Sequence, residues 1–124
     1  MKLVRQSPQS KVCGQACLAM LLGVTLLKAC ELVGHRKGTK TRELVAVLRA
    51  HGKQCGSRLV PFRRWGLHPR FKGLAKLSCG VSNWHWVVVW DDFVYDPLRG
   101  KSRLEDYERA LPTGYRLTSG LFTG

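Results

Sequence analysis

The feature that most constrains the fold of this chain is a run of apolar residues near its start. Residues 12–22 (VCGQACLAMLL) contain a single polar side chain, that of Gln15, and no charged one. A helix that is apolar on every side cannot lie on a surface, because each face would expose hydrophobic groups to water. We therefore predict a helix over 13–22, ended by Gly23, that is buried at the centre of the domain.

Two further helices are predicted in the first half of the chain. The first follows Thr25, whose hydroxyl can cap the first turn, and stops at Gly34. The second is expected to be capped by Thr41 and to end before Gly52. In both segments apolar residues recur at the spacing of one helix face: Leu26, Ala29, Cys30 and Val33 in the first, and Leu44, Val47 and Leu48 in the second.

The second half of the chain changes to the pattern of strands. Residues 85–90 (HWVVVW) and 93–96 (FVYD) are rich in β-branched and aromatic residues, which favour strands. Asp91 and Asp92 separate them as a short polar turn, so we predict an antiparallel hairpin. Weaker patterns predict the remaining strands over 57–62, 73–78 and 115–121.

One short helix is expected among these strands. Ser102 is followed three residues later by Glu105, which is the pattern of a capping box, and the helix would extend through Leu111. Three helices followed by mostly antiparallel strands predict an α+β fold, with the N-terminal helices packed on the sheet. The chain has 124 residues, so we expect a single domain over 1–124.

The cysteines and the N-terminus bear on cellular compartment and cofactors. Five cysteines make an odd number, and they lack the spacing of a disulfide framework. Cys13 and Cys17 lie one helical turn apart, but no second close pair of Cys or His completes a zinc site. Residues 1–8 lack the apolar core of a secretory signal, and no apolar run is long enough to cross a membrane. We expect a cytoplasmic protein with reduced thiols, no metal, no other cofactor and no membrane partner.

Cys13 stands where the buried helix begins. Unpaired backbone N–H groups and the positive end of the helix dipole converge at such a position. A helix N-terminus or a neighbouring imidazolium lowers the pKa of a cysteine and favours the nucleophilic thiolate. The same N–H groups can stabilise the oxyanion that forms during acyl transfer. A cysteine is otherwise an ordinary small apolar residue, and we assign that structural role to the others: Cys17, Cys30, Cys55 and Cys79.

A histidine and an aspartate lie on the predicted hairpin. His85 begins its first strand and Asp96 ends its second, so a two-residue turn places them nearly opposite each other. A hydrogen bond between them would fix the tautomer and orientation of the imidazole, as the third member of a catalytic triad does. Alone, each has an ordinary explanation, as a half-buried histidine and a turn-forming Asp-Pro. Together with Cys13 they predict a cysteine hydrolase.

These segments resemble the motifs of a known family. Residues 13–20 (CGQACLAM) are similar to the cysteine motif of the bacteriocin-processing peptidases, the papain-like enzymes that remove double-glycine leaders. Residues 85–89 (HWVVV) and the closing Asp-Pro resemble their histidine motif, and the similarity spans almost the whole chain. The resemblance implies a papain-like fold in which Cys13 is the nucleophile, His85 is the general base and then the acid, and Asp96 orients the imidazole.

The sequence departs from that family at two positions. Members usually carry an acidic residue before the cysteine, where this chain has Val12, and an oxyanion-stabilising glutamine six residues before it, where this chain has Ser7. Gln6 and Gln9 lie seven and four residues before Cys13. A small adjustment of the loop would bring Gln6 into place, and we prefer it to Gln9. The other interpretation is that both are exposed polar residues of a loop.

Three tryptophans share one face of the strongest predicted strand. Trp84, Trp86 and Trp90 are separated by even numbers of residues, so their side chains point to the same side. They either line a substrate groove or pack in the core, and the sequence leaves both interpretations open.

The charge of the chain supports a second interpretation. Lys and Arg total 21 against 8 Asp and Glu, a formal net charge of +13, which favours acidic partners. Basic residues concentrate in 35–42 and, interleaved with aromatic residues, in 63–72. The first hypothesis is a papain-like cysteine peptidase that hydrolyses a peptide or isopeptide bond in a peptide or protein, with acidic substrates among the candidates. The alternative is a non-catalytic basic module on the same fold that binds nucleic acid or an acidic protein.

Overall fold

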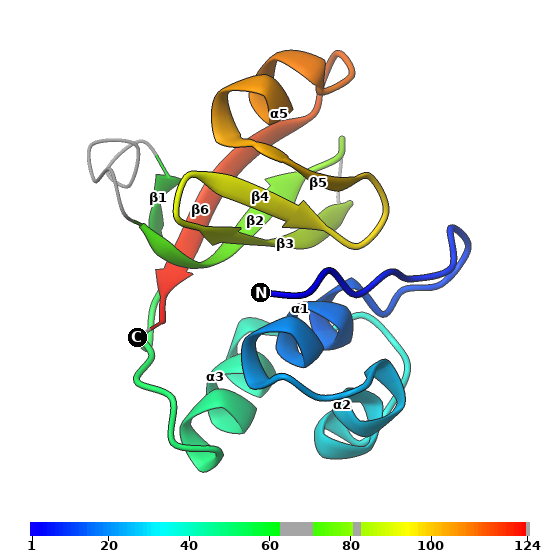
Figure 1. The fold of residues 1–124 in the computed structure, drawn as a ribbon, viewed down its shortest axis with the longest axis vertical. Coiled ribbons are helices and arrows are strands. Elements are labelled where there is room, and N and C mark those ends of the chain that lie inside the picture. Colours follow the sequence, from blue (N-terminus) through cyan, green and yellow to red (C-terminus); the bar gives the residue numbers. More distant parts are fainter. Residues whose placement is uncertain (63–70, 81–82, 124) are drawn as a thin grey trace.

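The computed structural model describes residues 1–62, 71–80 and 83–123, which form three layers (Figure 1). The first layer consists of three helices, α1 (Cys13–Leu22), α2 (Leu26–Val33) and α3 (Thr41–Ala50). The second is a sheet, and the third is helix α5 (Leu104–Ala110) on the opposite face of that sheet. The basic segment 63–72 noted in the sequence lies almost wholly outside the described residues.

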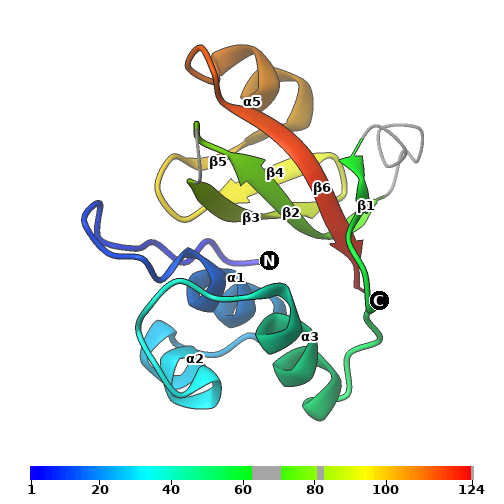
Figure 2. The same cartoon turned by 180° about the vertical axis from the view of Figure 1, so that it is seen from behind.

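The sheet has six strands among the described residues, and each pairs antiparallel to its neighbours in the order β1-β6-β2-β3-β4-β5. Strand β6 returns from α5 to lie between β1 and β2, as the view from behind shows (Figure 2). The predicted α+β architecture is confirmed. The strands span Val60–Pro61 (β1), Lys72–Ser78 (β2), Trp84–Trp90 (β3), Phe93–Asp96 (β4), Gly100–Arg103 (β5) and Arg116–Phe122 (β6).

Helix α1 is the buried helix that the apolar run predicts. Only Leu22 of its ten residues is not buried, and the helix packs against α2, α3 and β3. It ends at Gly23, which adopts a φ of 68° that other residues rarely take. Among the described residues no single helix is long and apolar enough to cross a membrane. Only α1 and α2 taken together, across a bend of 110°, reach that length and composition.

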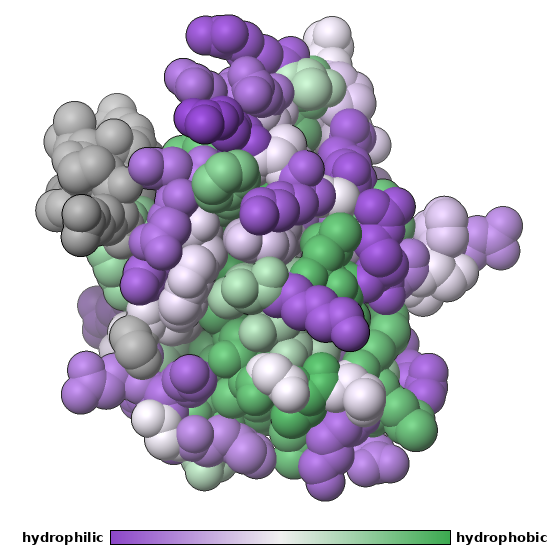
Figure 3. All heavy atoms as spheres, in the orientation of Figure 1, coloured by the Kyte–Doolittle hydropathy of each residue, from purple (hydrophilic) through white to green (hydrophobic). Residues whose placement is uncertain are grey.

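Strand β3 is buried on both faces and separates two hydrophobic cores. Successive side chains of a strand point to opposite sides, so Trp86 and Val88 contribute to the core with α1, whereas Val87 and Val89 belong to the core with Tyr107 of α5. On the outer surface, hydrophilic side chains gather over α5 and β5, and apolar ones gather below them over the N-terminal segment and α1 (Figure 3).

The hairpin of β3 and β4 forms as the sequence predicts. Asp91 and Asp92 both adopt positive φ, 49° and 69°, which is the conformation that matches the twist of a two-residue hairpin. Trp90 pairs with Phe93 across the turn. The same register places Asp96 opposite Val87, so His85 is its diagonal neighbour on one face of the sheet rather than its direct partner. Long side chains can still meet across such a diagonal.

Of the two predicted helix caps, one is confirmed and one is wrong. Thr25 caps α2 by accepting a hydrogen bond from the N–H of Lys28 at 3.1 Å. The cap residue of α3, however, is Lys40 rather than Thr41. The Glu43 carboxylate accepts a hydrogen bond from the Lys40 N–H at 2.8 Å, which satisfies this end of the helix without a threonine.

The predicted capping box of the last helix is wrong. Ser102 lies in strand β5, where it pairs with Val94, and α5 begins after Arg103 without any side-chain cap. Strand β5 was not expected from the sequence, because its residues (GKSR) have little strand preference and are ordered by pairing with β4. The strand predicted over 57–62 is reduced to Val60–Pro61 for a related reason, since only these two residues find a partner on β6.

Candidate active site

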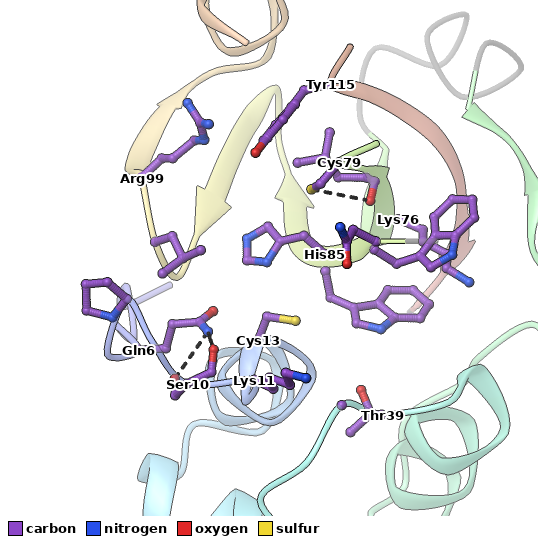
Figure 4. Close-up of a pocket in the computed structure, with 17 residues that line it drawn as sticks. Gln6, Ser10, Lys11, Cys13, Thr39, Lys76, Cys79, His85, Arg99 and Tyr115 are labelled. Carbon is purple, nitrogen blue, oxygen red and sulfur yellow. Dashed lines mark hydrogen bonds between the residues drawn. The ribbon is translucent and has the colours of Figure 1, made fainter. Parts of the chain in front are cut away.

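A hollow of about 660 Å³ lies between the N-terminal segment, the start of α1 and the adjoining ends of β2 and β3 (Figure 4). Cys13 and His85 both line it. Three of the six exposed large hydrophobic side chains in the described part of the chain, those of Trp84, Leu98 and Tyr115, line it as well. A concave site of this size with exposed aromatic groups is typical of a binding site for a ligand or a substrate.

Cys13 is the first residue of α1, so the backbone itself provides hydrogen-bond donors beside the thiol. The N–H groups of a first helical turn have no partner within the helix, and no side chain caps this one. Cys13 stands where the apolar run starts, and so lies at the boundary between the core and the pocket. The residue is 8% exposed.

His85 forms a short hydrogen bond with Asp96 behind the pocket. The distance from Nε2 of His85 to Oδ1 of Asp96 is 2.7 Å, and the aspartate is fully buried. The same Oδ1 accepts the Leu98 N–H at 2.8 Å, and Oδ2 accepts the Tyr107 hydroxyl at 2.6 Å. Both oxygens of the buried carboxylate are therefore held in place, and they hold the imidazole in turn.

The environment of this pair favours its charged form. Burial has the largest effect on the pKa of His85 and lowers it, but the hydrogen bond with Asp96, the interaction with Cys13 and the charges of both groups outweigh burial and raise that pKa from 6.5 to about 9. For Asp96, burial raises the pKa, whereas the hydrogen bonds and charge of His85, the Tyr107 hydroxyl and the Leu98 N–H lower it below its ordinary value. At neutral pH the imidazole is protonated and the carboxylate is ionised.

This coupling predicts how stability depends on pH. A histidine whose pKa rises on folding stabilises the fold fully below its unfolded value of 6.5, and it loses that contribution as the pH approaches about 9. We expect the free energy of unfolding in urea to be lower at about pH 8.5 than at about pH 6. Asp96→Asn is expected to lower stability at both values and to reduce the difference between them. An equal difference in the wild type and the variant would contradict the assignment.

Tyr107 is a site residue that the sequence analysis missed. It is the only buried residue of α5, and its hydroxyl donates to Asp96. Burial and the negative charge of Asp96 raise the pKa of Tyr107, which keeps the hydroxyl protonated as a donor. No short motif links positions 96 and 107. The helical spacing of α5 predicts an inward-facing residue there, but only the packing of α5 on β4 brings its hydroxyl to the carboxylate.

The structure separates the two glutamines that the sequence left as candidates. Gln6 is buried and lines the pocket with Cys13, whereas Gln9 is exposed and does not line it. The Gln6 N–H donates to the Pro97 carbonyl at 3.0 Å, which ties the N-terminal segment to the end of the hairpin. Its side-chain Nε2 donates to the backbone oxygen of Ser10 at 3.1 Å, and its buried Oε1 has no partner among the described residues.

The three tryptophans divide between the two roles that the sequence left open, which are lining a groove and packing in the core. Trp84 is 53% exposed and Trp86 is buried, and both line the pocket. Trp90, at the other end of β3, packs against the core and does not line the pocket.

The other cysteines behave as thiols in the structure. Cys17 and Cys30 are buried, whereas Cys55 and Cys79 are half-buried, and all are free. Burial raises the pKa of Cys17, Cys55 and Cys79, which keeps them protonated near neutral pH. Cys79 nevertheless lines the same pocket as Cys13, a position that its sequence context did not indicate. Within the described ranges no group of three or more His, Cys, Asp or Glu side chains is placed to hold a metal ion.

Comparison with solved structures gives a match along the entire chain. One matching structure is the peptidase domain of Streptococcus ComA, described as a bifunctional ABC transporter involved in a quorum-sensing pathway. This chain has the fold of that peptidase domain. The alignment covers 99% of this chain and 97% of the other, with a TM-score of 0.64 and 19% sequence identity. The resemblance that the motifs indicated is thus confirmed for the fold. No protein-family model and no curated protein matches the sequence.

Proposed function

We propose that this protein is a papain-like cysteine peptidase that hydrolyses a peptide or isopeptide bond. The observation that carries the proposal is one pocket that holds Cys13 at the start of α1 together with His85, whose imidazole is bonded to the buried Asp96 at 2.7 Å. The shared fold with a peptidase domain supports the same reaction class. The protonated imidazole and the helix N-terminus are the two groups that stabilise a thiolate.

In the proposed reaction the Cys13 thiolate attacks the carbonyl carbon of the scissile bond. The tetrahedral oxyanion accepts hydrogen bonds from the free N–H groups of the first turn of α1. The amine leaves with a proton from His85, and a thioester forms on Sγ. His85 then takes a proton from water as the water attacks the thioester, and collapse of the second tetrahedral intermediate releases the acid and regenerates the Cys13 thiolate beside the protonated imidazole. Asp96 keeps the imidazole oriented throughout, while Leu98 and Tyr107 hold Asp96.

Gln6 is the side chain we propose as an additional oxyanion donor. Its amide nitrogen bonds to Ser10 in the free enzyme and would exchange this partner for the oxyanion. Gln6→Ala is expected to lower turnover by about 10²–10³, the usual cost of losing such a donor. Gln54→Ala, at an exposed position away from the pocket, is the matched control and should leave turnover unchanged. Equal losses in the two variants would contradict the assignment, and circular dichroism would verify that both remain folded.

The reaction class is tested by alkylation of the native protein. With iodoacetamide near neutral pH, we expect rapid labelling at Cys13 and slow labelling at Cys79, the other cysteine that lines the pocket, with mass spectrometry locating the adducts. In His85→Ala the labelling of Cys13 should slow to the rate of an ordinary thiol. Labelling that is equally fast at Cys79, or that does not depend on His85, would contradict the proposed peptidase.

A further inference from the structure

We infer that the pocket selects substrates with acidic side chains next to the bond that is cut. This inference rests on the proposed function, because it names the substrate class of the same site. Three cations line the pocket, Lys11, Lys76 and Arg99, and no Asp or Glu is among the described residues that line it. A concave site lined by charges of one sign concentrates ligands of the opposite sign.

Lys76 is the most constrained of these cations. It lies on β2 opposite Trp86, and its ammonium group sits over the indole rings of Trp84 at 4.5 Å and Trp86 at 5.6 Å. Lys72 lies on the same face of the same strand and pairs with Asp91 at 3.8 Å. No carboxylate in the described part of the chain pairs with Lys76. The two indole rings therefore hold its ammonium group beside the pocket, and no carboxylate of the described residues neutralises the charge.

Arg99 provides the second charge from a different element. It follows Leu98, whose N–H is bonded to Asp96, and its guanidinium lies over the Tyr115 ring at 5.5 Å. Figure 4 shows Arg99 and Lys76 on opposite sides of His85. A substrate bound across Cys13 would therefore meet a cation on either side. A guanidinium can hold a carboxylate through two parallel hydrogen bonds.

The carboxylate of Asp96, which is bonded to His85, does not cancel the positive potential of these three cations in the pocket. Asp96 is fully buried, and its two oxygens bond to His85, Leu98 and Tyr107. Its charge is balanced by the protonated imidazole. The three cations at the pocket surface thus remain without a carboxylate partner among the described residues. These charges, which are part of the net charge of +13, would attract an acidic substrate.

The positive surface continues beyond the pocket. A second hollow, of about 420 Å³, shares Ser10 and Lys11 with the first and adds Arg36 and Lys37 to its walls. Among the described residues that line it, none is acidic. The two hollows together indicate that acidic residues are recognised at several positions along an extended peptide rather than at one.

The electrostatic potential at Cys13 can be measured without knowing the substrate. Iodoacetate is negatively charged and iodoacetamide is neutral, and both alkylate the same thiol. A positive potential in the pocket therefore raises the ratio of the iodoacetate rate to the iodoacetamide rate. We expect Lys76→Met and Arg99→Gln each to lower this ratio about twofold to fivefold, and added salt to lower it in the wild type. Methionine keeps an apolar stem against the tryptophans. Lys53→Met removes one charge outside the pocket and should leave the ratio unchanged.

Peptide binding completes the test. With the Cys13→Ala variant, calorimetry should give tighter binding of a Glu-Ala hexapeptide than of a Lys-Ala hexapeptide, and Lys76→Met should reduce the difference. Equal binding of the two peptides, together with unchanged alkylation ratios, would overturn the inference and leave the peptidase proposal standing. Tighter binding of a short single-stranded oligonucleotide at the same site would overturn it in favour of a nucleic-acid partner. Slow, His85-independent labelling by iodoacetamide would overturn the proposed function, and with it the inference about a cleaved bond, whatever the peptide affinities show.

Discussion

Cys13→Ala is expected to abolish peptide hydrolysis while leaving the fold intact. Loss of the nucleophile in an enzyme that forms a covalent intermediate lowers turnover by about 10⁶, because no neighbouring group can replace it. Cys13 lies at the edge of the core beside the pocket, and alanine keeps its Cβ and removes only the sulfur, so the fold should be retained. The measurement is mass spectrometry of a proteome-derived peptide library after incubation with the wild type and the variant, with unfolding in urea as the check on stability.

The matched control for this prediction is Cys79→Ala. Cys79 lines the same pocket, but it stands at the end of β2 rather than at a helix N-terminus, and burial raises the pKa of its thiol. We expect nearly full activity in that variant. If Cys13→Ala kept its activity, or if the wild type cut no peptide in the library, the proposed function would be wrong. If Cys79→Ala were the inactive variant, the nucleophile would have been misassigned.

Gly73→Ala is expected to produce the largest loss of stability among the single substitutions considered. A methyl group at Gly73 would overlap the backbone carbonyl oxygen of Leu121 and would also press on the ring of Phe71. Gly73 pairs with Phe122 on β6 and with Val89 on β3, so the overlap would force apart the strands that join the end of the chain to the centre of the sheet. We expect a cost of about 3 kcal/mol in the free energy of unfolding, because backbone cannot move aside as a side chain can.

Urea unfolding of Gly73→Ala beside Gly38→Ala isolates this steric effect. Gly38 has no neighbouring atoms where a methyl group would lie, and its backbone does not require a positive φ. We expect the control to unfold within about 0.5 kcal/mol of the wild type. Equal stability of the two variants would show that β6 can shift to accept the methyl group.

Much of the site was predictable because it depends on local patterns. The apolar run from residue 12 to 22 requires a buried helix, and Cys13 is at its start. The β-branched and aromatic residues of 85–96, interrupted by Asp91 and Asp92, favour a hairpin that carries His85 and Asp96. Local sequence determines both elements, and hence the side chains that they carry.

Other features follow from contacts between distant segments. Ser102 and Glu105 have the spacing of a capping box, yet pairing with β4 places Ser102 in a strand, because a ladder of hydrogen bonds outweighs one cap. Sequence spacing favoured Gln6 over Gln9, but the burial of Gln6 in the pocket and the hydrogen bond from its N–H to the Pro97 carbonyl join segments far apart in the chain. These interactions leave no local signal in the sequence.

By itself, the sequence determined the helix that carries Cys13, the proposed nucleophile, the hairpin that carries His85 and Asp96, and the excess of positive charge. The tertiary structure decided that Tyr107 holds Asp96, that Gln6 lines the pocket, and that Lys76 and Arg99 flank it. The physical reason is that helix and strand periodicity is encoded within short segments, whereas the meeting of side chains from β2, β4 and α5 depends on how the whole chain packs.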